Sequence, residues 1–303
     1  MNWSLLLKFQ IIEMANLKEI RNRIASVGST MQITSAMKMV SAAKLKRAQD
    51  AITQMRPYAE KLQEILVNIS ASLDLTENAY SEVREEKNVL IVGVTSNRGL
   101  CGGFNNNIIK KVNQMLANEY PNAKVLCLGK KIKDTFKKTD RYYINDSIKD
   151  VEDIFNNLSF ANSAIITESL MNLFTTGEFD KVVVVYNSFV NAAIQDVKAE
   201  QLLPIQSVET TEEVTTNVDY SFEPSKQEIV QDLIPKSLKI QLFKAILDSH
   251  ASEHGARMTA MHKATDNAKE LKRNLTISYN KARQAAITNE ILEIVGGAEA
   301  LNN

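Results

Sequence analysis

A glycine-rich segment between a predicted strand and a predicted helix is the first place where this sequence could bind a ligand. It reads Arg98-Gly-Leu-Cys-Gly-Gly-Phe104, and phosphate-binding loops lie at the same position in α/β proteins. However, it does not match G-x-G-x-x-G, and it lacks the Gly-Lys-Ser/Thr ending that would hold phosphate and magnesium. The next predicted strand ends at Gly129-Lys130 rather than in the acid that binds a ribose. We therefore expect these glycines to serve tight turning and close packing.

Cys101 lies inside this segment and could act as a nucleophile only if a base lay near it. The three histidines, His250, His254 and His262, all fall in the predicted C-terminal helix, so the middle of the chain supplies no imidazole. We expect a buried, inert thiol. Cys101 and Cys127 are too few for a disulfide framework, which indicates a reducing, intracellular compartment.

The segment His250-Ala-Ser-Glu-His254 matches the H-x-x-E-H pattern of one class of zinc peptidase. Zinc catalysis also needs a third ligand and an open coordination position in a cleft, and a single long helix supplies neither. We expect the two imidazoles to face solvent or a partner. The sequence offers no Ser/His/Asp arrangement and no acidic metal cluster, so we predict no catalytic residue, no cofactor and no metal; the chain is not an enzyme by itself.

The charge of the chain is balanced overall but unevenly placed. Its 36 basic and 36 acidic residues give a formal net charge of zero, so the sequence indicates no global attraction to nucleic acid or to an anionic membrane. Residues 14–50 carry seven Lys/Arg against two acids, whereas residues 209–232 carry seven acids against one lysine. An acidic partner could bind the basic helix face. No aromatic residues interleave with it, as single-stranded nucleic acid would require, and no apolar run reaches the roughly eighteen residues of a membrane span.

Two long segments at the ends of the chain have the pattern of amphipathic helices. Apolar residues recur at helical spacing from Leu17 to Leu73 and, thinned by Ala and polar residues, from Met258 to Leu292. At about 1.5 Å per residue each helix would span on the order of 90 Å, far more than the mean globular helix. Their matched length and heptad-like spacing predict an antiparallel coiled coil. The alternative, two unrelated helices of a bundle, rarely needs such length.

Two prolines bear on where these helices end. Pro57 lies inside the N-terminal run and predicts a kink near Arg56. Pro235 predicts an interruption between the long C-terminal helix and a short helix that Ser225 could cap.

The middle of the chain alternates short apolar runs with amphipathic segments. This alternation predicts a parallel, right-handed α/β sheet with a Rossmann-like architecture, which by itself says nothing about a ligand. The predicted strands are residues 89–94, 125–128 and 182–186, and the predicted helices are residues 105–119, 130–138 and 160–175. The fold class is therefore α/β, a long antiparallel coiled coil of the N- and C-terminal helices with an inserted Rossmann-like α/β domain.

These patterns divide the chain into five parts. Met14 followed by Ala15 and Asn16 looks like a genuine start, so we expect the residues before it to be a non-native start or a disordered extension. The predicted parts are residues 1–13 (extension), 14–75 (N-terminal coiled-coil helix), 76–208 (α/β domain), 209–235 (acidic loop and short helix) and 236–303 (C-terminal coiled-coil helix).

Several of these segments together resemble the gamma-subunit family of the bacterial F-type rotary ATP synthases. The resemblance runs from Met14 to the C-terminus, and its motifs occur in the order that the family has. They are Lys18–Arg21, Ile24–Val27, Ile33–Val40, Arg56–Glu60, Arg98–Gly103, Ala256–Met258, Ala264–Asn267 and Tyr279–Gln284 followed by Ile287-Thr288.

The resemblance implies a function without an active site in this chain. A gamma subunit is the central rotor shaft inside a hexameric head of alpha and beta subunits, and the head holds the catalytic nucleotide sites. The shaft couples ion-driven rotation of the membrane ring to conformational changes at the beta subunits, for ATP synthesis or, in reverse, hydrolysis. The implied partners are the alpha, beta and epsilon subunits and the c-subunit ring, at the cytoplasmic face of the bacterial inner membrane as a peripheral protein.

The resemblance also implies two sets of contact residues. The beta subunits would meet Met37 and Lys38 on the N-terminal helix, and Arg257, Arg283, Gln284, Thr288 and Glu290 on the C-terminal helix. The membrane ring and epsilon would meet Tyr220, Phe222 and Glu223. Two other readings stay open: a passive coiled-coil scaffold, and an α/β nucleotide-binding enzyme with helical arms.

Overall fold

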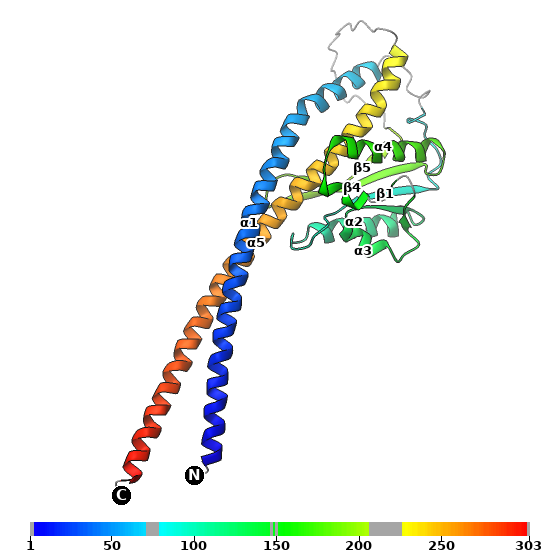
Figure 1. The fold of residues 1–303 in the computed structure, drawn as a ribbon. Helices are drawn as coiled ribbons and strands as arrows, with labels where there is room; N and C mark the ends of the chain where they lie inside the picture. The colour runs from blue at the N-terminus through cyan, green and yellow to red at the C-terminus, as the bar shows by residue number, and fades with distance from the viewer. Residues whose placement is uncertain (1–2, 71–78, 146–147, 149–150, 206–225, 302–303) are drawn as a thin grey trace. The chain divides into compact units, whose positions relative to one another are not determined.

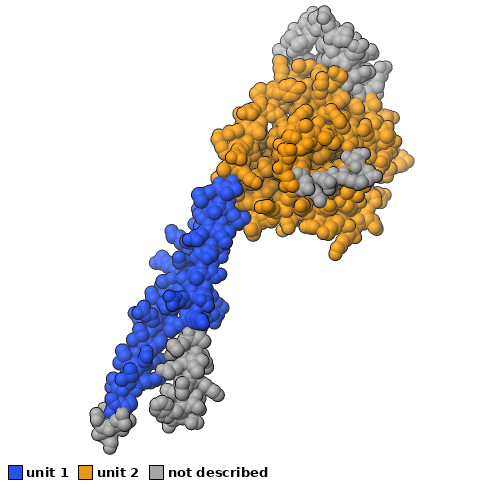
Figure 2. Space-filling model, viewed as in Figure 1, with its two compact units in different colours: residues 1–40, 260–303 blue, residues 41–259 orange. Residues whose placement is uncertain are grey.

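The computed structural model describes residues 3–70, 79–145, 148, 151–205 and 226–301 (Figure 1). The chain forms two compact units (Figure 2), which are residues 1–40 with 260–303 (unit 1) and residues 41–259 (unit 2). Two long helices, α1 (Trp3–Ser70) and α5 (Lys226–Leu301), contribute to both units. α1 therefore includes residues 3–13, for which we expected an extension. The units also divide each helix near its middle, whereas the predicted parts kept both helices apart from the α/β domain.

Unit 1 is a pair of antiparallel helical segments. Thr34 of α1 is hydrogen-bonded to Thr265 of α5, and six residues earlier in α1, Gly28 faces Lys272 of α5. Moving toward the N-terminus of α1 therefore means moving toward the C-terminus of α5, so the two helices run antiparallel. The predicted antiparallel pairing of the terminal helices is confirmed within this unit.

Unit 2 contains a five-stranded sheet in the order β3-β2-β1-β4-β5. The strands are β1 (Val89–Val94), β2 (Lys124–Leu128), β3 (Tyr142–Tyr143), β4 (Lys181–Phe189) and β5 (Gln195–Leu203). The three predicted strands, β1, β2 and β4, are parallel as predicted; the two-residue β3, which was not predicted, pairs parallel with β2, and β5 pairs antiparallel with β4. β5 was not predicted, because its sequence is mostly polar and only its last two residues, Leu202 and Leu203, are buried in this edge strand.

Helices cover both faces of the sheet (Figure 1). α2 (Phe104–Asn118) and α3 (Lys130–Phe136) pack on one face, and alternate strand residues such as Ile91 and Val125 point toward them. The opposite face, with Leu90 and Val92, packs against α4 (Phe160–Thr175) and the first part of α5. A short 3-10 helix, η3 (Val151–Asn156), lies between β3 and α4 in the chain. The sheet is therefore buried on both faces, as its continuous apolar runs predict.

Packing against the sheet also explains why α5 continues through Pro235. The predicted interruption at this residue is wrong, since α5 is one helix from Lys226 to Leu301. Ile234 and Leu238 on either side of the proline are buried in the sheet core. Tertiary burial of this kind can outweigh the roughly 3 kcal/mol that an interior proline costs a helix. α1 likewise continues through Pro57, while Ser225 lies outside the described residues.

Gly129, between β2 and α3, shows a structural use of glycine. Its φ of +109° is one that side chains rarely adopt, and a Cβ atom there would lie 2.1 Å from the carbonyl oxygen of Thr95. The turn therefore requires glycine for close backbone packing. None of the helices in the described part of the chain is long and apolar enough to cross a bilayer.

Candidate functional site

The two helices of unit 1 meet along a seam of small and hydroxyl side chains. Thr265 Oγ1 donates a hydrogen bond to Thr34 Oγ1 over 2.8 Å, and Thr34 Oγ1 donates to the carbonyl oxygen of Met31 over 3.1 Å. Thr34 is 8% exposed, and Met261 and Ala268 are also buried. The seam therefore buries few large side chains, as the thinned apolar pattern of the C-terminal segment indicated.

The outer surface of unit 1, by contrast, exposes large apolar side chains. On α1, Ile33, Met39 and Val40 are all more than half exposed. On α5 the large apolar residues that are exposed are Leu271, Ile277, Ile287, Ile291, Leu292, Ile294 and Val295. Extended exposed apolar surface is typical of a region against which another macromolecule packs.

Six of the predicted beta-subunit contacts fall in unit 1. Met37 and Lys38 on α1 are half-buried. The α5 residues of the set, Arg283, Gln284, Thr288 and Glu290, are exposed. All six therefore have side chains that a partner could reach, and their contact with a partner stays a prediction.

Arg257, the seventh predicted contact, is placed differently. It belongs to unit 2, is 7% exposed, and forms an ion pair with Glu253 one turn earlier in α5. Its Nη2 donates to the carbonyl oxygens of Arg98 and Gly99 at 3.1 and 3.2 Å. Because the guanidinium is bonded within this chain, contact of Arg257 with a beta subunit stays a prediction, and the contact set proposed below is built on the other six residues. The acid-first i,i+4 spacing of Glu253 and Arg257 was the sequence signal for this pair.

The carbonyls that Arg257 binds belong to the glycine-rich loop, residues 98–103. Ser96, just before the loop, places its Oγ 2.7 Å from the carbonyl oxygen of Arg98 and 3.0 Å from Asn105 Oδ1. Asn105 Oδ1 also accepts a hydrogen bond from the Ser96 backbone N–H. The Asn105 side-chain amide donates to Cys101 Sγ over 3.2 Å. The polar groups of the loop are thus hydrogen-bonded within this chain, to Arg257 of α5 and to Ser96 and Asn105.

The same loop shields the thiol of Cys101. This residue is 1% exposed and packs with Phe104 and with Ala256 of α5. Burial raises the pKa of the thiol, which disfavours the nucleophilic thiolate. The predicted burial of Cys101 is confirmed, and Cys127 is buried inside β2.

The expectation that His250 and His254 face solvent or a partner is wrong for solvent at His254, which is buried, while His250 is half-buried. His254 is 5% exposed, and its ring makes an edge-on contact with His250, which stacks on Phe155. Burial lowers the pKa of His250 to about 4 and that of His254 to about 3. Neutral His254 can therefore offer Nδ1 to Arg257 Nη1, 3.4 Å away. The error arose because helical spacing alone does not say which layer a helix packs against.

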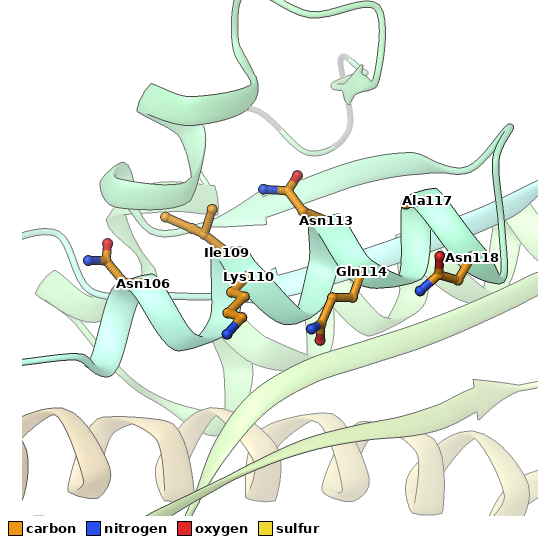
Figure 3. Close-up of a pocket in the computed structure, with 7 residues that line it drawn as sticks. All are labelled: Asn106, Ile109, Lys110, Asn113, Gln114, Ala117 and Asn118. Atoms are coloured by element: carbon orange, nitrogen blue, oxygen red, sulfur yellow. The ribbon is translucent and has the colours of Figure 1, made fainter.

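In the described ranges no group of three or more His, Cys, Asp and Glu residues converges as metal ligands would. An open hollow follows the outward face of α2, and Figure 3 shows the residues that line it: Asn106, Ile109, Lys110, Asn113, Gln114, Ala117 and Asn118. Lys110 is the one charged side chain among these seven, and the glycine-rich loop does not line the hollow.

The predicted contacts with the membrane ring and epsilon cannot be placed. Tyr220, Phe222 and Glu223 lie outside the described residues. These three assignments therefore rest on the sequence resemblance alone.

Comparison with known proteins gives consistent similarities over almost the whole chain. A family model described as ATP synthase matches residues 16–301. The ATP synthase gamma chain of Christiangramia forsetii is 61% identical over 292 residues, which is 95% of this chain and all of the relative. That of Flavobacterium johnsoniae is 60% identical over the same length and coverage.

Solved structures show a related architecture. The central stalk and c-ring structure of the Tetrahymena thermophila mitochondrial ATP synthase contains a chain with 26% identity and a TM-score of 0.55, covering 77% of this chain and 99% of that one. A chain of the Euglena gracilis mitochondrial ATP synthase has a TM-score of 0.64 and covers 95% of both chains. Its identity of 21% supports likeness of fold alone.

Proposed function

This chain belongs to the ATP synthase gamma chain family, and on that premise we propose that it is the central rotor shaft of an F-type ATP synthase. It couples ion-driven rotation of the membrane ring to sequential conformational changes at the catalytic beta subunits, and it can run in reverse during ATP hydrolysis. The observation that carries this proposal is unit 1, an antiparallel helix pair whose narrow seam leaves large apolar and charged side chains on its outer surface.

The proposed mechanism is coupling by differential contact. The α1 and α5 surfaces differ in sequence, so each beta subunit around the shaft would meet a different set of side chains at any moment. A ligand or partner shifts a conformational equilibrium only through a difference in its interaction with the two states. Rotation would pass each beta subunit through every contact in turn. In this scheme the chain transmits torque and sets the order in which the beta subunits change conformation, and its partners supply the catalytic groups.

We propose that six residues make the beta-subunit contacts. Lys38, next to Met37 on α1, carries a positive charge that suits an acidic lever of a beta subunit. On α5 the exposed set is Arg283, Gln284, Thr288 and Glu290. Arg283 can form bidentate pairs with a carboxylate, a geometry that lysine does not reproduce.

We also propose that the chain contacts the c-subunit ring and epsilon through Tyr220, Phe222 and Glu223. These contacts would hold the chain as a peripheral protein at the cytoplasmic face of a bacterial inner membrane. Support for this part comes from the motifs shared with the gamma-subunit family.

Co-purification tests the proposed assembly. The full chain, expressed with its alpha, beta and epsilon partners, should elute in one complex that hydrolyses ATP, with the stoichiometry measured by mass spectrometry. A passive scaffold would not appear in fixed stoichiometry with nucleotide-hydrolysing subunits. Titration of the full chain alone with ATP should release no heat; binding heat would favour a nucleotide-binding enzyme.

The contact set has a separate test in the reconstituted complex. The double variant Arg283→Ala, Gln284→Ala should lower rotational torque and coupled ATP synthesis, because a charged and an amide contact are both lost. Arg273→Ala is the matched control, since Arg273 is an exposed arginine of α5 outside the proposed set. Unchanged torque in the double variant would show that these two residues are not contacts.

A further inference from the structure

Arg257 is a buried arginine that is not part of the proposed beta-subunit contact set. It lies on α5 with 7% of its surface exposed. Burying a guanidinium is unfavourable unless its charge is paired and its donors are bonded. Three groups provide this here: Glu253 pairs with the charge, and the carbonyl oxygens of Arg98 and Gly99 accept from Nη2. Two of the three partners are thus backbone atoms of one loop.

Glu253 orients the guanidinium for this task. It sits one helical turn before Arg257, is 7% exposed, and binds Nη1. His254 adds a contact from Nδ1 to the same Nη1 at 3.4 Å. With Nη1 held by α5 itself, Nη2 is left to face the loop, where it bridges two successive carbonyls. A planar guanidinium presents Nη1 to Glu253 and Nη2 to the two carbonyls at the same time, whereas the single nitrogen of a lysine cannot occupy both positions.

The loop has a conformation that needs an external restraint. Leu100 has a φ of +63° and Gly102 a φ of +59°. The left-handed conformation is costly for a leucine, and its side chain is 65% exposed, so burial does not compensate. A non-glycine residue stays in such a conformation only when its surroundings determine it. The two carbonyls that Arg257 binds are those of Arg98 and of Gly99, the residue just before Leu100.

We infer that Arg257 is a positioning residue: its guanidinium, oriented by Glu253, ties the glycine-rich loop to α5, keeps Leu100 in its left-handed conformation and closes the loop over Cys101. In the rotor, this makes Leu100 a fixed rather than an adaptable point on the exposed surface of unit 2. That consequence rests on the proposed function, whereas the tie itself is a property of this chain.

Cys101 provides a local reporter of the tie. Its sulfur is buried under the loop, and Cys127 is buried in β2, so the full chain holds one cysteine that depends on the loop and one that depends on the sheet. N-ethylmaleimide labelling of the full chain, followed in time by mass spectrometry of the two peptides, measures both rates in one sample. Local opening exposes only the first, and global unfolding exposes both.

The central variant is Arg257→Lys, which keeps a positive charge beside Glu253 but cannot hold that carboxylate and the two loop carbonyls at the same time. We expect the labelling rate of Cys101 to rise about tenfold or more, as the loss of charge-assisted hydrogen bonds predicts. The rate at Cys127 should not change. Arg273→Lys, an exposed position on the same helix, is the control and should alter neither rate.

Leu100→Gly supplies a rescue that a general packing role would not give. Glycine adopts a positive φ without the penalty of leucine, so adding it to Arg257→Lys should recover part of the protection of Cys101. The inference is overturned if Arg257→Lys leaves the Cys101 rate unchanged, or if it accelerates both cysteines equally. Because labelling uses this chain alone, failure to co-purify with alpha and beta subunits would refute the rotor assignment and leave this result untouched.

Discussion

The histidine pair of unit 2, in which His254 is buried and His250 half-buried, predicts that this unit loses stability as the pH falls below about 6.5. The pKa of His250 is lowered to about 4 and that of His254 to about 3, mainly by burial. The unfolded chain therefore binds more protons than the folded chain between these values and the ordinary histidine pKa of about 6.5. Stability is fully present above pH 6.5 and falls as protons bind preferentially to the unfolded state.

The size of this effect follows from the linkage relation. At pH 5, a histidine whose pKa drops from about 6.5 to about 4 on folding costs roughly 2 kcal/mol relative to neutral pH. The same relation gives roughly 2 kcal/mol for His254 at this pH. The two rings are 4.6 Å apart between centroids, so their protonation is coupled and the two contributions are not strictly additive.

His250→Phe isolates one contribution. Phenylalanine keeps a ring to stack on Phe155 but cannot be protonated, so the free energy lost between pH 7.5 and pH 5 should shrink by about 2 kcal/mol. Hydrogen exchange of peptides from residues 245–257, corrected for the intrinsic pH dependence of exchange, measures that loss. His262→Phe is the control, since His262 is an exposed residue of unit 1. An identical pH dependence in wild type and His250→Phe would refute the reasoning.

Two further predictions concern the seam and the turns. In a double-mutant cycle, Thr34→Val and Thr265→Val should each cost about 0.5–1.5 kcal/mol, and the double variant less than their sum, because both remove one shared hydrogen bond; hydrogen exchange in unit 1 checks this, and strict additivity would contradict it. Gly129→Ala should destabilise unit 2 by about 3 kcal/mol or more, since its Cβ would overlap Thr95. Gly102→Ala, with open space around its Cβ, should cost only about 1–2 kcal/mol in urea unfolding, and equal costs would refute the packing argument.

The buried parallel strands could be predicted from the sequence because they are apolar without interruption. β1 was predicted with its observed bounds, and β2 and β4 were predicted within a few residues. β5 could not be predicted, since an edge strand needs few apolar residues and Lys198 and Ala199 are exposed. The interruption expected at Pro235 failed for a related reason: local helix propensity does not include burial against a sheet that forms far away in the sequence.

The candidate site shows the same limit. The spacing of His250 and His254 predicted that they share a helix face, but not that the face is buried. Arg257 was assigned to a partner contact because its family motif suggested function, whereas its hydrogen bonds go to a loop about 160 residues earlier in the chain. Contacts between segments so distant in sequence carry no periodic signal.

The central claim, that this chain is a rotor shaft, is tested most directly by observing rotation. A Lys110→Cys variant, with the new thiol on the exposed face of α2, would carry a probe while the alpha and beta subunits of the assembled complex are fixed to a surface. We predict stepwise rotation of the probe in one direction when ATP is added. A probe that stays still while the same complexes hydrolyse ATP would contradict the account.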